Sequence, residues 1–594
     1  MEIRTSLLLL LLGLTSSISL AQNNCTASLP TGTCKAPATV QAWCAGNNSA
    51  STCPGGKSKV GFYTSSPAAG SWSGQFEGLD AASILSALFP PRAQADPAGG
   101  IGPKDSSGVG QFLEVAGGAV QAFDRATGKG IFSHRQNTGG APQPLSSLFY
   151  PGGSSYCGSG TADAVASYDR LDGVFVLGNI FNPGGAGSYY YCIGVSASVG
   201  GVSASNLEGF NHQSFWNVYA YNLTPAIPHN AKGQTYFPDY SRFGTWGNGF
   251  YVAFDLEDPS TNDVNIVGFE VCKLDKAHII AGLSSNPPVC YTYIPSYVAG
   301  IGGTNASLIH TLLPADFEGS NPIPGNTAGE YFLAQVNPSN PGSNAQCTLA
   351  PCKSSQLAFW TWSGFVSGSG PTFITTSAYT PGCYNLSRVW NTVCVVQPYG
   401  GVSDSVGDRL MTRLAYRNLA GAKSGEYLAV AHTIQEDPTS QRTGVRYYQI
   451  AASSSPVVSL SGDVQDTRNL YFASVPSVAM DSNGDLGITF TVTGKSGLSV
   501  FNYDPSPFFI TVSSAGVVGN PVQILPNSGV SGQDETDTSW GEYVTVTSDP
   551  SDDLTFWAVN EYMNGNQTGN CNGISALGCK WATRVFACKK GSGC

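Results

Sequence analysis

The chain has 594 residues, a formal net charge of −11, and only 11% charged residues. This negative charge disfavours binding to nucleic acid or to an anionic membrane surface. Hydrophobic residues make up 41% of the sequence, so the chain can bury a large core.

The first 21 residues have the pattern of a secretory signal peptide. An arginine near the start is followed by the apolar run LLLLLLGL and by the small-residue cleavage pattern Ser19-Leu20-Ala21. The apolar run is too short to span a bilayer, and no later stretch approaches about 18 uninterrupted apolar residues. We therefore expect residues 1–21 to be removed, and the mature chain to be exported to the periplasm or the extracellular space without a membrane span.

Most of the 16 cysteines lie in near pairs along the chain. In an oxidising compartment this spacing predicts local disulfides. A metal site is the alternative, but the chain has no C-x-x-C motif and its six histidines are scattered. The predicted bonds are Cys157–Cys192, Cys272–Cys290, Cys347–Cys352, Cys383–Cys394 and Cys571–Cys579, with Cys25, Cys34, Cys44 and Cys53 paired among themselves.

Residues 22–106 hold these four N-terminal cysteines. They have little strand pattern and one short helix candidate, Asp80–Phe89. We therefore expect an irregular, disulfide-pinned N-terminal segment.

From residue 107 onward the pattern is that of strands, with one hairpin repeated along the chain. An alternating run, an Asp/Asn/Gly/Ser turn and a second run occur at Ala164–Gly178, Val475–Phe490 and Val544–Trp557, with a degenerate copy at Phe243–Phe254. A lone hairpin cannot bury its apolar face, so repeated hairpins must stack on one another.

Seven units of about 50–70 residues fit four-stranded blades. We predict an all-β fold, a seven-bladed β-propeller with four-stranded antiparallel blades over residues 107–594. The alternative, a β-sandwich plus a second β domain, accounts less well for the repeats. Units Gly110–His134 and Trp540–Cys588 look short of strands, so we expect them to be neighbours that close the ring.

Several motifs resemble a group of secreted bacterial β-propeller proteins, which are distantly similar to sialidase-type propellers. The resemblance implies a fold and an extracellular location, but no activity. It rests on these motifs: AVQAFDRATGK (Ala119–Lys129), SYDRLDGVFV (Ser167–Val176), FPDYSRFGTW (Phe237–Trp246), LLPADFEG (Leu312–Gly319), DRLMTRLAYRN (Asp408–Asn418), WGEYVTVTSDPSDDLTFWAVNEY (Trp540–Tyr562) and WATRVF (Trp581–Phe586).

Acidic residues stand near the start of the first strand in four units: Asp163, Asp239, Asp408 and Glu542. The first strands of a propeller line its axis, so these carboxylates should converge at one end of the channel. Such a group could hold Ca²⁺. The alternative, which we favour, is that each carboxylate accepts hydrogen bonds from a neighbouring blade.

Arg409, Arg413 and Arg417 share one face of a predicted strand. Three guanidiniums on one face could clamp a carboxylate or sulfate ligand. The alternative, which we favour, pairs them with nearby acids such as Asp408.

The turn at Asp481, Asn483 and Asp485 spaces three oxygen ligands as a calcium loop does. Leu486 stands where such a loop needs glycine, and Asn483-Gly484 is typical of a tight hairpin turn. We therefore favour the hairpin.

Catalytic motifs are absent from the sequence: it contains no G-x-S-x-G, no H-E-x-x-H and no phosphate loop. Glu561, Tyr562 and Arg584 form the best catalytic candidate, as a glycosidase-like acid, nucleophile and clamp. A cross-strand ion pair is the alternative that we favour.

These observations predict an extracellular binding or structural protein that recognises glycans or a cell-surface polymer. A hydrolase or lyase that acts on glycans at the channel mouth is the second hypothesis.

Overall fold

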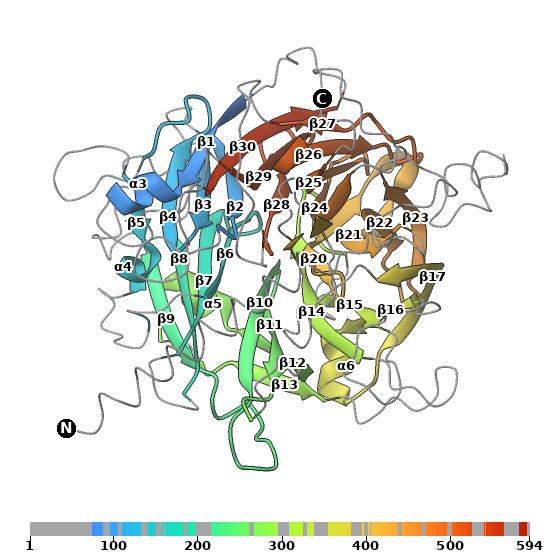
Figure 1. The fold of residues 1–594 in the computed structure, drawn as a ribbon. Helices are drawn as coiled ribbons and strands as arrows, with labels where there is room; N and C mark the ends of the chain where they lie inside the picture. Colours follow the sequence, from blue (N-terminus) through green and yellow to red (C-terminus); the bar gives the residue numbers. More distant parts are fainter. Residues whose placement is uncertain are drawn as a thin grey trace, which may run out of the picture.

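The computed structural model describes residues 74–86, 95–104, 110–131, 141–149, 157, 162–182, 188–196, 216–260, 266–284, 286–294, 308–324, 329–337, 354–381, 395–396, 402–403, 405–436, 442–465, 471–495, 502–524, 540, 542–563 and 581–590. Within these ranges small antiparallel sheets stand around a central axis, as in a propeller (Figure 1). One strand of each four-stranded sheet lies next to the axis, and the eight-stranded sheet contributes two.

Five sheets have four strands each. Four of them run in chain order from the axis outward: β2 (Ala98–Lys104), β3 (Gly110–Ala116), β4 (Ala119–Asp124) and β5 (Gln143–Pro144); β6 (Ala162–Asp169), β7 (Val174–Phe181), β8 (Tyr190–Ser196) and β9 (Trp216–Asn222); β10 (Phe237–Trp246), β11 (Gly249–Glu257), β12 (Ile266–Leu274) and β13 (Val289–Tyr293); and β24 (Phe472–Met480), β25 (Leu486–Lys495), β26 (Asn502–Val512) and β27 (Val522–Gln523). The fifth combines β28 (Thr545–Ser548), β29 (Thr555–Met563) and β30 (Trp581–Lys589) with β1 (Gly74–Asp80).

The remaining large sheet has eight strands. Its halves are β14 (Leu308–Phe317), β15 (Tyr331–Asn337), β16 (Ser354–Thr361) and β17 (Thr372–Pro381), and β20 (Leu410–Leu419), β21 (Gly425–Gln435), β22 (Thr443–Ala451) and β23 (Val457–Val464). The halves join through a parallel pairing of β14 with β20, in which Asp316 is the partner of Ala415. The sequence predicts seven separate blades, whereas the described residues form five such sheets and this one of eight strands. The difference arises because two inner strands, running side by side along the axis, come close enough to form hydrogen bonds.

The smaller elements are β18 (Val395–Val396) paired with β19 (Val402–Ser403), the helices α3 (Ala81–Ser86), α4 (Leu145–Phe149), α5 (Lys276–Ala281) and α6 (Trp362–Ser367), and the 3₁₀ turn η2 (Gly421–Lys423). Helix α3 lies where the sequence predicts one. No helix in the described ranges is long and apolar enough to cross a membrane.

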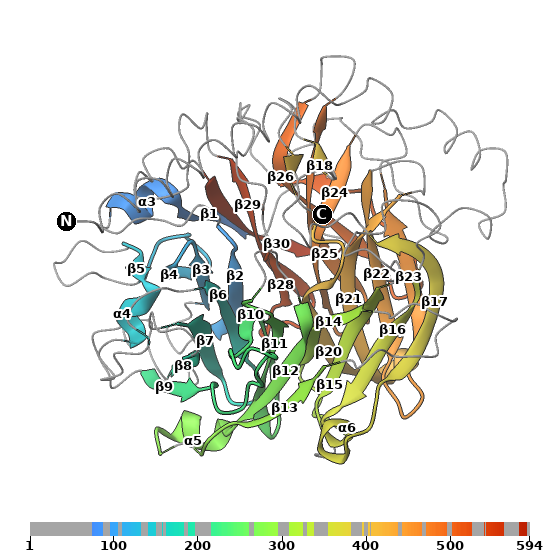
Figure 2. The ribbon, with the colours of Figure 1, turned by 60° about the horizontal axis from the view of Figure 1, so that its bottom comes forward.

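The inner strands form a closed ring of contacts. Each of β2, β6, β10, β14, β20, β24 and β28 contacts the next, and β28 contacts β2. The predicted neighbourhood of the first and last units is therefore confirmed. Strand β1 pairs with β30 as the outer strand of the last sheet, and both views show the two side by side (Figures 1 and 2). Strands β1 and β2 belong to residues 22–106, so this segment is not irregular throughout.

The repeated turn predicted from the sequence joins the inner strand of a sheet to the second strand. Ala164–Gly178 forms the β6–β7 hairpin, Val475–Phe490 forms β24–β25, and Val544–Trp557 forms β28–β29. Phe243–Phe254 forms β10–β11. All four hairpins are therefore confirmed, and each turn lies at the end of the axis opposite to the start of its inner strand.

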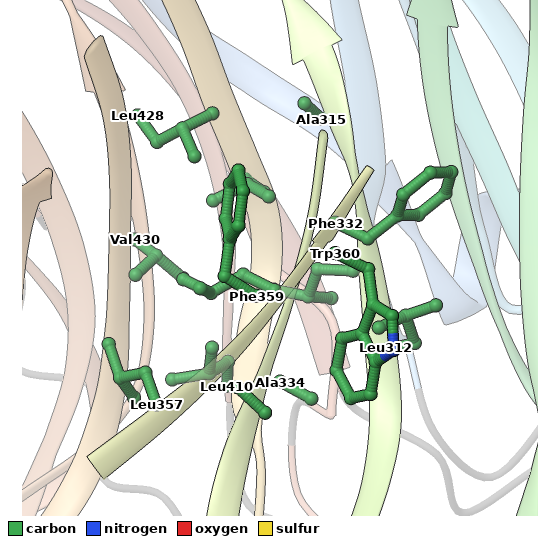
Figure 3. Close-up of a cluster of buried hydrophobic side chains, with 14 of the residues drawn as sticks. Leu312, Ala315, Phe332, Ala334, Leu357, Phe359, Trp360, Leu410, Leu428 and Val430 are labelled. Atoms are coloured by element: carbon green, nitrogen blue, oxygen red, sulfur yellow. The ribbon is translucent and has the colours of Figure 1, made fainter. Parts of the chain in front are cut away.

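Buried side chains fill the space between neighbouring sheets. Between the halves of the eight-stranded sheet, Leu312 and Phe332 lie with Phe359, Leu428 and Val430 in one cluster (Figure 3). Full burial of each such side chain contributes about 1.5–3 kcal/mol. Apolar contact between the faces of neighbouring sheets therefore makes a large contribution to the stability of the ring.

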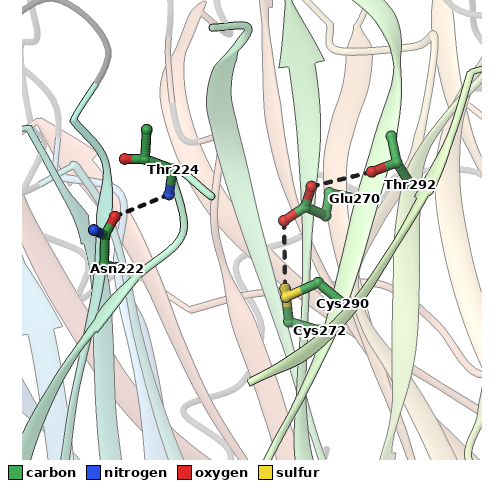
Figure 4. The surroundings of a disulfide bond; sticks show 6 residues. All are labelled: Asn222, Thr224, Glu270, Cys272, Cys290 and Thr292. Atoms are coloured by element: carbon green, nitrogen blue, oxygen red, sulfur yellow. Dashed lines mark hydrogen bonds between the residues drawn. A yellow bond between two sulfur atoms is a disulfide. The ribbon is translucent and has the colours of Figure 1, made fainter. Parts of the chain in front are cut away.

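Two predicted disulfides lie within the described residues, and both are present. Cys157 bonds Cys192, and Cys272 of β12 bonds Cys290, which lies opposite it on β13 (Figure 4). Cys588 is also disulfide-bonded. The other predicted pairs, Cys347–Cys352, Cys383–Cys394, Cys571–Cys579 and those among the N-terminal four, lie outside the described residues.

Candidate functional site

Four inner strands share a backbone distortion near their first residues. Asp163, Tyr240, Thr311 and Val475 have φ values of +50°, +54°, +53° and +49°. Each lies within an irregularity of the strand pairing. Left-handed backbone at a non-glycine residue costs about 1–2 kcal/mol, so neighbouring groups must stabilise it.

Partners on neighbouring blades supply that stabilisation. The Tyr240 N–H donates to Asp163 Oδ2 at 2.9 Å, and the Thr311 N–H donates to Asp255 Oδ1 at 2.5 Å. The Val475 N–H donates to Thr433 Oγ1 at 3.1 Å. These bonds hold the starts of the inner strands together at one end of the axis, which we call the mouth.

Tyr240 is the centre of an acidic cluster at the mouth. Its N–H binds Asp163, and its hydroxyl donates to Glu542 Oε2. The carboxyl groups of Asp163 and Asp239 are hydrogen-bonded to each other. We call Asp163, Asp239, Tyr240 and Glu542 the mouth cluster; all four side chains are partly exposed. Three of the four carboxylates that the sequence predicts to converge therefore do so directly.

The fourth carboxylate, Asp408, joins through Arg409. This arginine donates to Asp408 through Nε at 2.7 Å and through Nη2 at 2.8 Å. Its guanidinium carbon lies 3.9 Å from the centre of the Tyr240 ring. Arg242 also lies against Tyr240, at 4.7 Å, and against Tyr543, at 4.3 Å. Two buried cations thus contact the tyrosine of the mouth cluster, and desolvated contacts of this kind contribute about 2 kcal/mol each.

The surroundings of the mouth cluster favour its protonated forms. Burial, and next the charge of Asp163, raise the pKa of Asp239 well above its ordinary value. Burial also raises the pKa of Glu542, although the Tyr240 hydroxyl and Arg409 oppose the shift. Burial and the charge of Glu542 raise the pKa of Tyr240, so its phenol keeps its proton. Asp239 is therefore the acid of the mouth cluster whose protonated form is favoured both by burial and by a neighbouring negative charge.

Further along the axis from the mouth, the side chain of Arg413 reaches from β20 to groups on β14 and β28. Its Nη2 lies 2.8 Å from Asp316 Oδ2, and its Nη1 donates to Glu318 Oε1 at 2.7 Å and to the Val546 carbonyl at 3.1 Å. Asp316 and Glu318 are buried. We call Arg413, Asp316 and Glu318 the axial ion group.

The two acids of this group bind the other inner strands. Asp316 also accepts from Thr245 Oγ1 at 2.6 Å and from Ser167 Oγ at 3.2 Å. Glu318 also accepts from the N–H groups of Ser548 and Met480 at 3.1 and 3.2 Å. Six inner strands, β6, β10, β14, β20, β24 and β28, therefore meet on one ionic network, which lies between the mouth and the far end of the axis.

The third arginine, Arg417, lies deeper still. It donates to Ser548 Oγ at 2.6 Å and lies 3.3 Å from Asp553, which also binds Arg170 at 2.6 Å. Arg409, Arg413 and Arg417 thus lie at three depths, are all buried, and each binds an acid. This is the paired arrangement that the sequence favours over a shared ligand clamp.

The predicted calcium loop is a hairpin turn between β24 and β25. Asp481 Oδ1 accepts from the N–H groups of Asn483 and Asp485, at 2.8 and 2.9 Å. Asp485 binds Lys590 at 2.5 Å. Burial raises the pKa of Asp481 to about 6. Asp481 therefore stabilises the turn, and Asp485 ties it to Lys590.

Among the described residues, one group of three acidic, histidine or cysteine side chains has ligand atoms close enough to share a metal ion: Glu270, Cys272 and Cys290 (Figure 4). Both cysteines of this group are in a disulfide, so they offer no thiolate. The carboxylates of the mouth cluster do not form such a group of three.

The predicted catalytic set lies on the outer strands, away from the mouth. Tyr562 and Arg584 both bind Glu77 of β1. Glu561 is the neighbour of Tyr562 along β29, and its side chain is buried on the opposite face. Glu561 therefore does not face Tyr562 and Arg584.

Sequence reasoning missed the residues that organise the mouth: Tyr240, Arg242 and Tyr543. They stand in the motifs FPDYSRFGTW and WGEYVTV, next to the predicted acids Asp239 and Glu542. Their position next to those acids was the one sequence signal that could have indicated a role at the mouth.

No protein-family model and no curated protein matches the chain. Solved structures similar to it include a Trypanosoma rangeli sialidase in complex with sialic acid, at 12% identity and a TM-score of 0.33. That match covers 73% of this chain and 54% of the sialidase, so the chain spans about half of that protein's length.

Two further similar structures are a polysaccharide lyase, Uly1, and a Penicillium chrysogenum α-L-arabinanase complexed with arabinobiose. The lyase is 11% identical, with a TM-score of 0.36, and the match covers 87% of this chain and 97% of the lyase. The arabinanase is 8% identical, with a TM-score of 0.33, over 86% and 98%. At these scores, function must be inferred from the chain's own residues.

Proposed function

We propose that the chain cleaves glycans at the mouth cluster, as a hydrolase or a lyase. The observation that carries the proposal is one juxtaposition: the carboxyl group of Asp239 is hydrogen-bonded to that of Asp163, and Tyr240 binds Asp163 through its N–H and Glu542 through its hydroxyl. These groups are partly exposed, so a ligand could reach them.

Cleavage of a glycosidic bond needs a group that protonates the leaving oxygen and a group that accepts a proton. We assign the first role to Asp239, because its surroundings keep it protonated. We assign the second role to Glu542, because its carboxylate already accepts a hydrogen bond from the Tyr240 hydroxyl, and this bond and Arg409 oppose the rise in its pKa that burial causes. General acid–base catalysis of this kind contributes about 10²–10⁴-fold to the rate.

The chain should be tested as the purified protein with a panel of oligosaccharides. Release of new reducing ends without unsaturated products indicates a hydrolase, and unsaturated products that absorb in the ultraviolet indicate a lyase. We expect Asp239→Asn and Glu542→Gln each to lower the rate by about 10²-fold or more. Asp552→Asn is the matched control, because Asp552 is an exposed acid in the β28–β29 turn at the far end.

Binding without cleavage is the second candidate, and it was the first expectation from the sequence. Buried donors beside the mouth cluster favour it, since the described residues give no hydrogen-bond partner to Tyr543 Oη or to Arg242 Nη2. Saturable oligosaccharide binding by the wild-type protein with no product would support this candidate and refute catalysis.

We further propose that the ring has seven blades, with each half of the eight-stranded sheet counted as one, and that the chain is exported like the secreted β-propeller proteins its motifs resemble. The two disulfides support export, because such bonds persist in oxidising compartments. Export would be tested by expressing the full chain with its leader and sequencing the N-terminus of the protein recovered outside the cytoplasm. Intact leader on cytoplasmic protein would refute it.

A further inference from the structure

At the mouth the acids are more exposed than the neighbouring cations. Asp163, Asp239 and Glu542 are partly exposed, as is Asp96, which accepts a hydrogen bond from the Glu542 N–H at 3.1 Å. The nearest arginines are 1% exposed at Arg242 and 7% exposed at Arg409. A ligand that approaches this end therefore meets carboxyl groups before it meets a guanidinium.

Contacts with neighbouring side chains hold Arg409 in place. Its guanidinium binds Asp408 through two nitrogens and covers a face of Tyr240. Arg242 is enclosed by Tyr240 and Tyr543. Neither cation can rotate outward to meet an acidic ligand without giving up these contacts.

A second observation points independently to a ligand at this site. Tyr543 is 1% exposed, and its hydroxyl has no hydrogen-bond partner among the described residues. The same holds for Arg242 Nε and Nη2. Buried polar groups are nearly always hydrogen-bonded. Hydroxyl oxygens of a sugar could accept from these donors, while the mouth carboxylates accept from the sugar.

We infer that the mouth cluster takes glycans that carry free amino groups, in preference to their N-acetylated counterparts, and that it disfavours glycans that carry carboxylate or sulfate. The inference rests on the proposed site and deepens it. An ammonium group beside Asp163 or Glu542 gains charge-assisted hydrogen bonds, which are stronger than neutral ones. A uronate or sulfate would instead face like charge, and the chain's net charge of −11 adds to that repulsion.

The test compares three sets of oligosaccharides of equal length: fully deacetylated glucosamine oligomers, their N-acetylated forms, and galacturonate oligomers. Binding to the full chain is measured by calorimetry at slightly acidic pH, where the amino groups are charged. We expect the deacetylated set to bind about tenfold more tightly than the acetylated set, and the galacturonate set to bind weakest. Equal or tighter binding of acetylated or acidic oligomers would overturn the inference.

Single substitutions test whether the preference for amino groups arises at the mouth cluster. Glu542→Gln and Asp163→Asn should each reduce the preference for amino groups to a few-fold or less, while Asp552→Asn should leave it unchanged. An unchanged preference in the two mouth variants, each shown to be folded by its melting temperature, would overturn the inference.

Binding and product formation separate this inference from the proposed function. The expected order of binding without any product would refute cleavage and support the inference. Cleavage of acidic oligomers alone would refute the inference and support cleavage. Failure of all three sets to bind would overturn the inference, while the wider oligosaccharide panel still tests cleavage.

Discussion

Replacement of Arg413 by alanine should be among the most destabilising single changes in this chain. Arg413 lies 2.8 Å from Asp316 and 2.7 Å from Glu318, and it donates to the Val546 carbonyl at 3.1 Å. Its removal leaves two buried carboxylates near the axis without their counter-ion. Breaking a buried ion pair from one side costs about 3–5 kcal/mol.

The structure places the expected cost towards the lower end of that range. Asp316 keeps hydrogen bonds from Thr245 and Ser167, and Glu318 keeps those from the N–H groups of Ser548 and Met480. These donors continue to stabilise the two negative charges. We therefore expect Arg413→Ala to lower the free energy of unfolding by about 3 kcal/mol. Arg413→Lys should cost less, about 1–2 kcal/mol, because it keeps the charge but loses the planar fork that binds both acids.

The assay is urea unfolding followed by tryptophan fluorescence, with free energies obtained by linear extrapolation. The matched control is Arg584→Ala. Arg584 also binds an acid, but the side chain of its partner Glu77 is 52% exposed, so its loss should cost about 0–1 kcal/mol. The reasoning is refuted if Arg413→Ala costs no more than Arg584→Ala.

Three further predictions concern the ring closure, a disulfide and the mouth. Glu114 of β3 lies against β30, and burial raises its pKa from 4.5 to about 8. The folded chain therefore binds this proton more tightly than the unfolded chain does, so the free energy of unfolding should fall as the pH rises through this interval. Glu114→Gln should flatten that fall, and equal slopes for the two proteins in unfolding measured between about pH 5 and about pH 9 would contradict the prediction. Removal of the Cys272–Cys290 bond by the double serine variant should cost about 3 kcal/mol, because the bond closes a loop of 18 residues; an unchanged urea midpoint would exclude this contribution. EDTA should leave the melting temperature unchanged, because Arg409 and Tyr240 already bind the mouth carboxylates; a drop that Ca²⁺ reverses would instead support the calcium role predicted for Asp163, Asp239, Asp408 and Glu542.

Patterns within a short stretch of sequence were enough to predict much of the fold. Alternating apolar residues around a turn predicted the hairpins β6–β7, β24–β25 and β28–β29, because side-chain alternation is a property of a single strand. The pair Cys272–Cys290 was readable for a similar reason, since its cysteines are 18 residues apart on one predicted hairpin. The pair Cys157–Cys192 followed because these two cysteines remained after the near pairs had been assigned. The start of each inner strand also marked which carboxylates would meet at the mouth.

Only the tertiary structure decided what those carboxylates contact. Tyr240 and Glu542 are 302 residues apart, and no local sequence pattern indicates that the tyrosine hydroxyl binds that acid. Nor does a local pattern indicate that Arg242 packs against both Tyr240 and Tyr543. The same holds for β1, which joins β30 across 507 residues at Glu77 and Arg584, and for the parallel pairing of β14 with β20. Hydrophobic alternation sets which face of a strand is buried, whereas ring closure, ion pairing and the mouth cluster depend on which strands become neighbours around the axis.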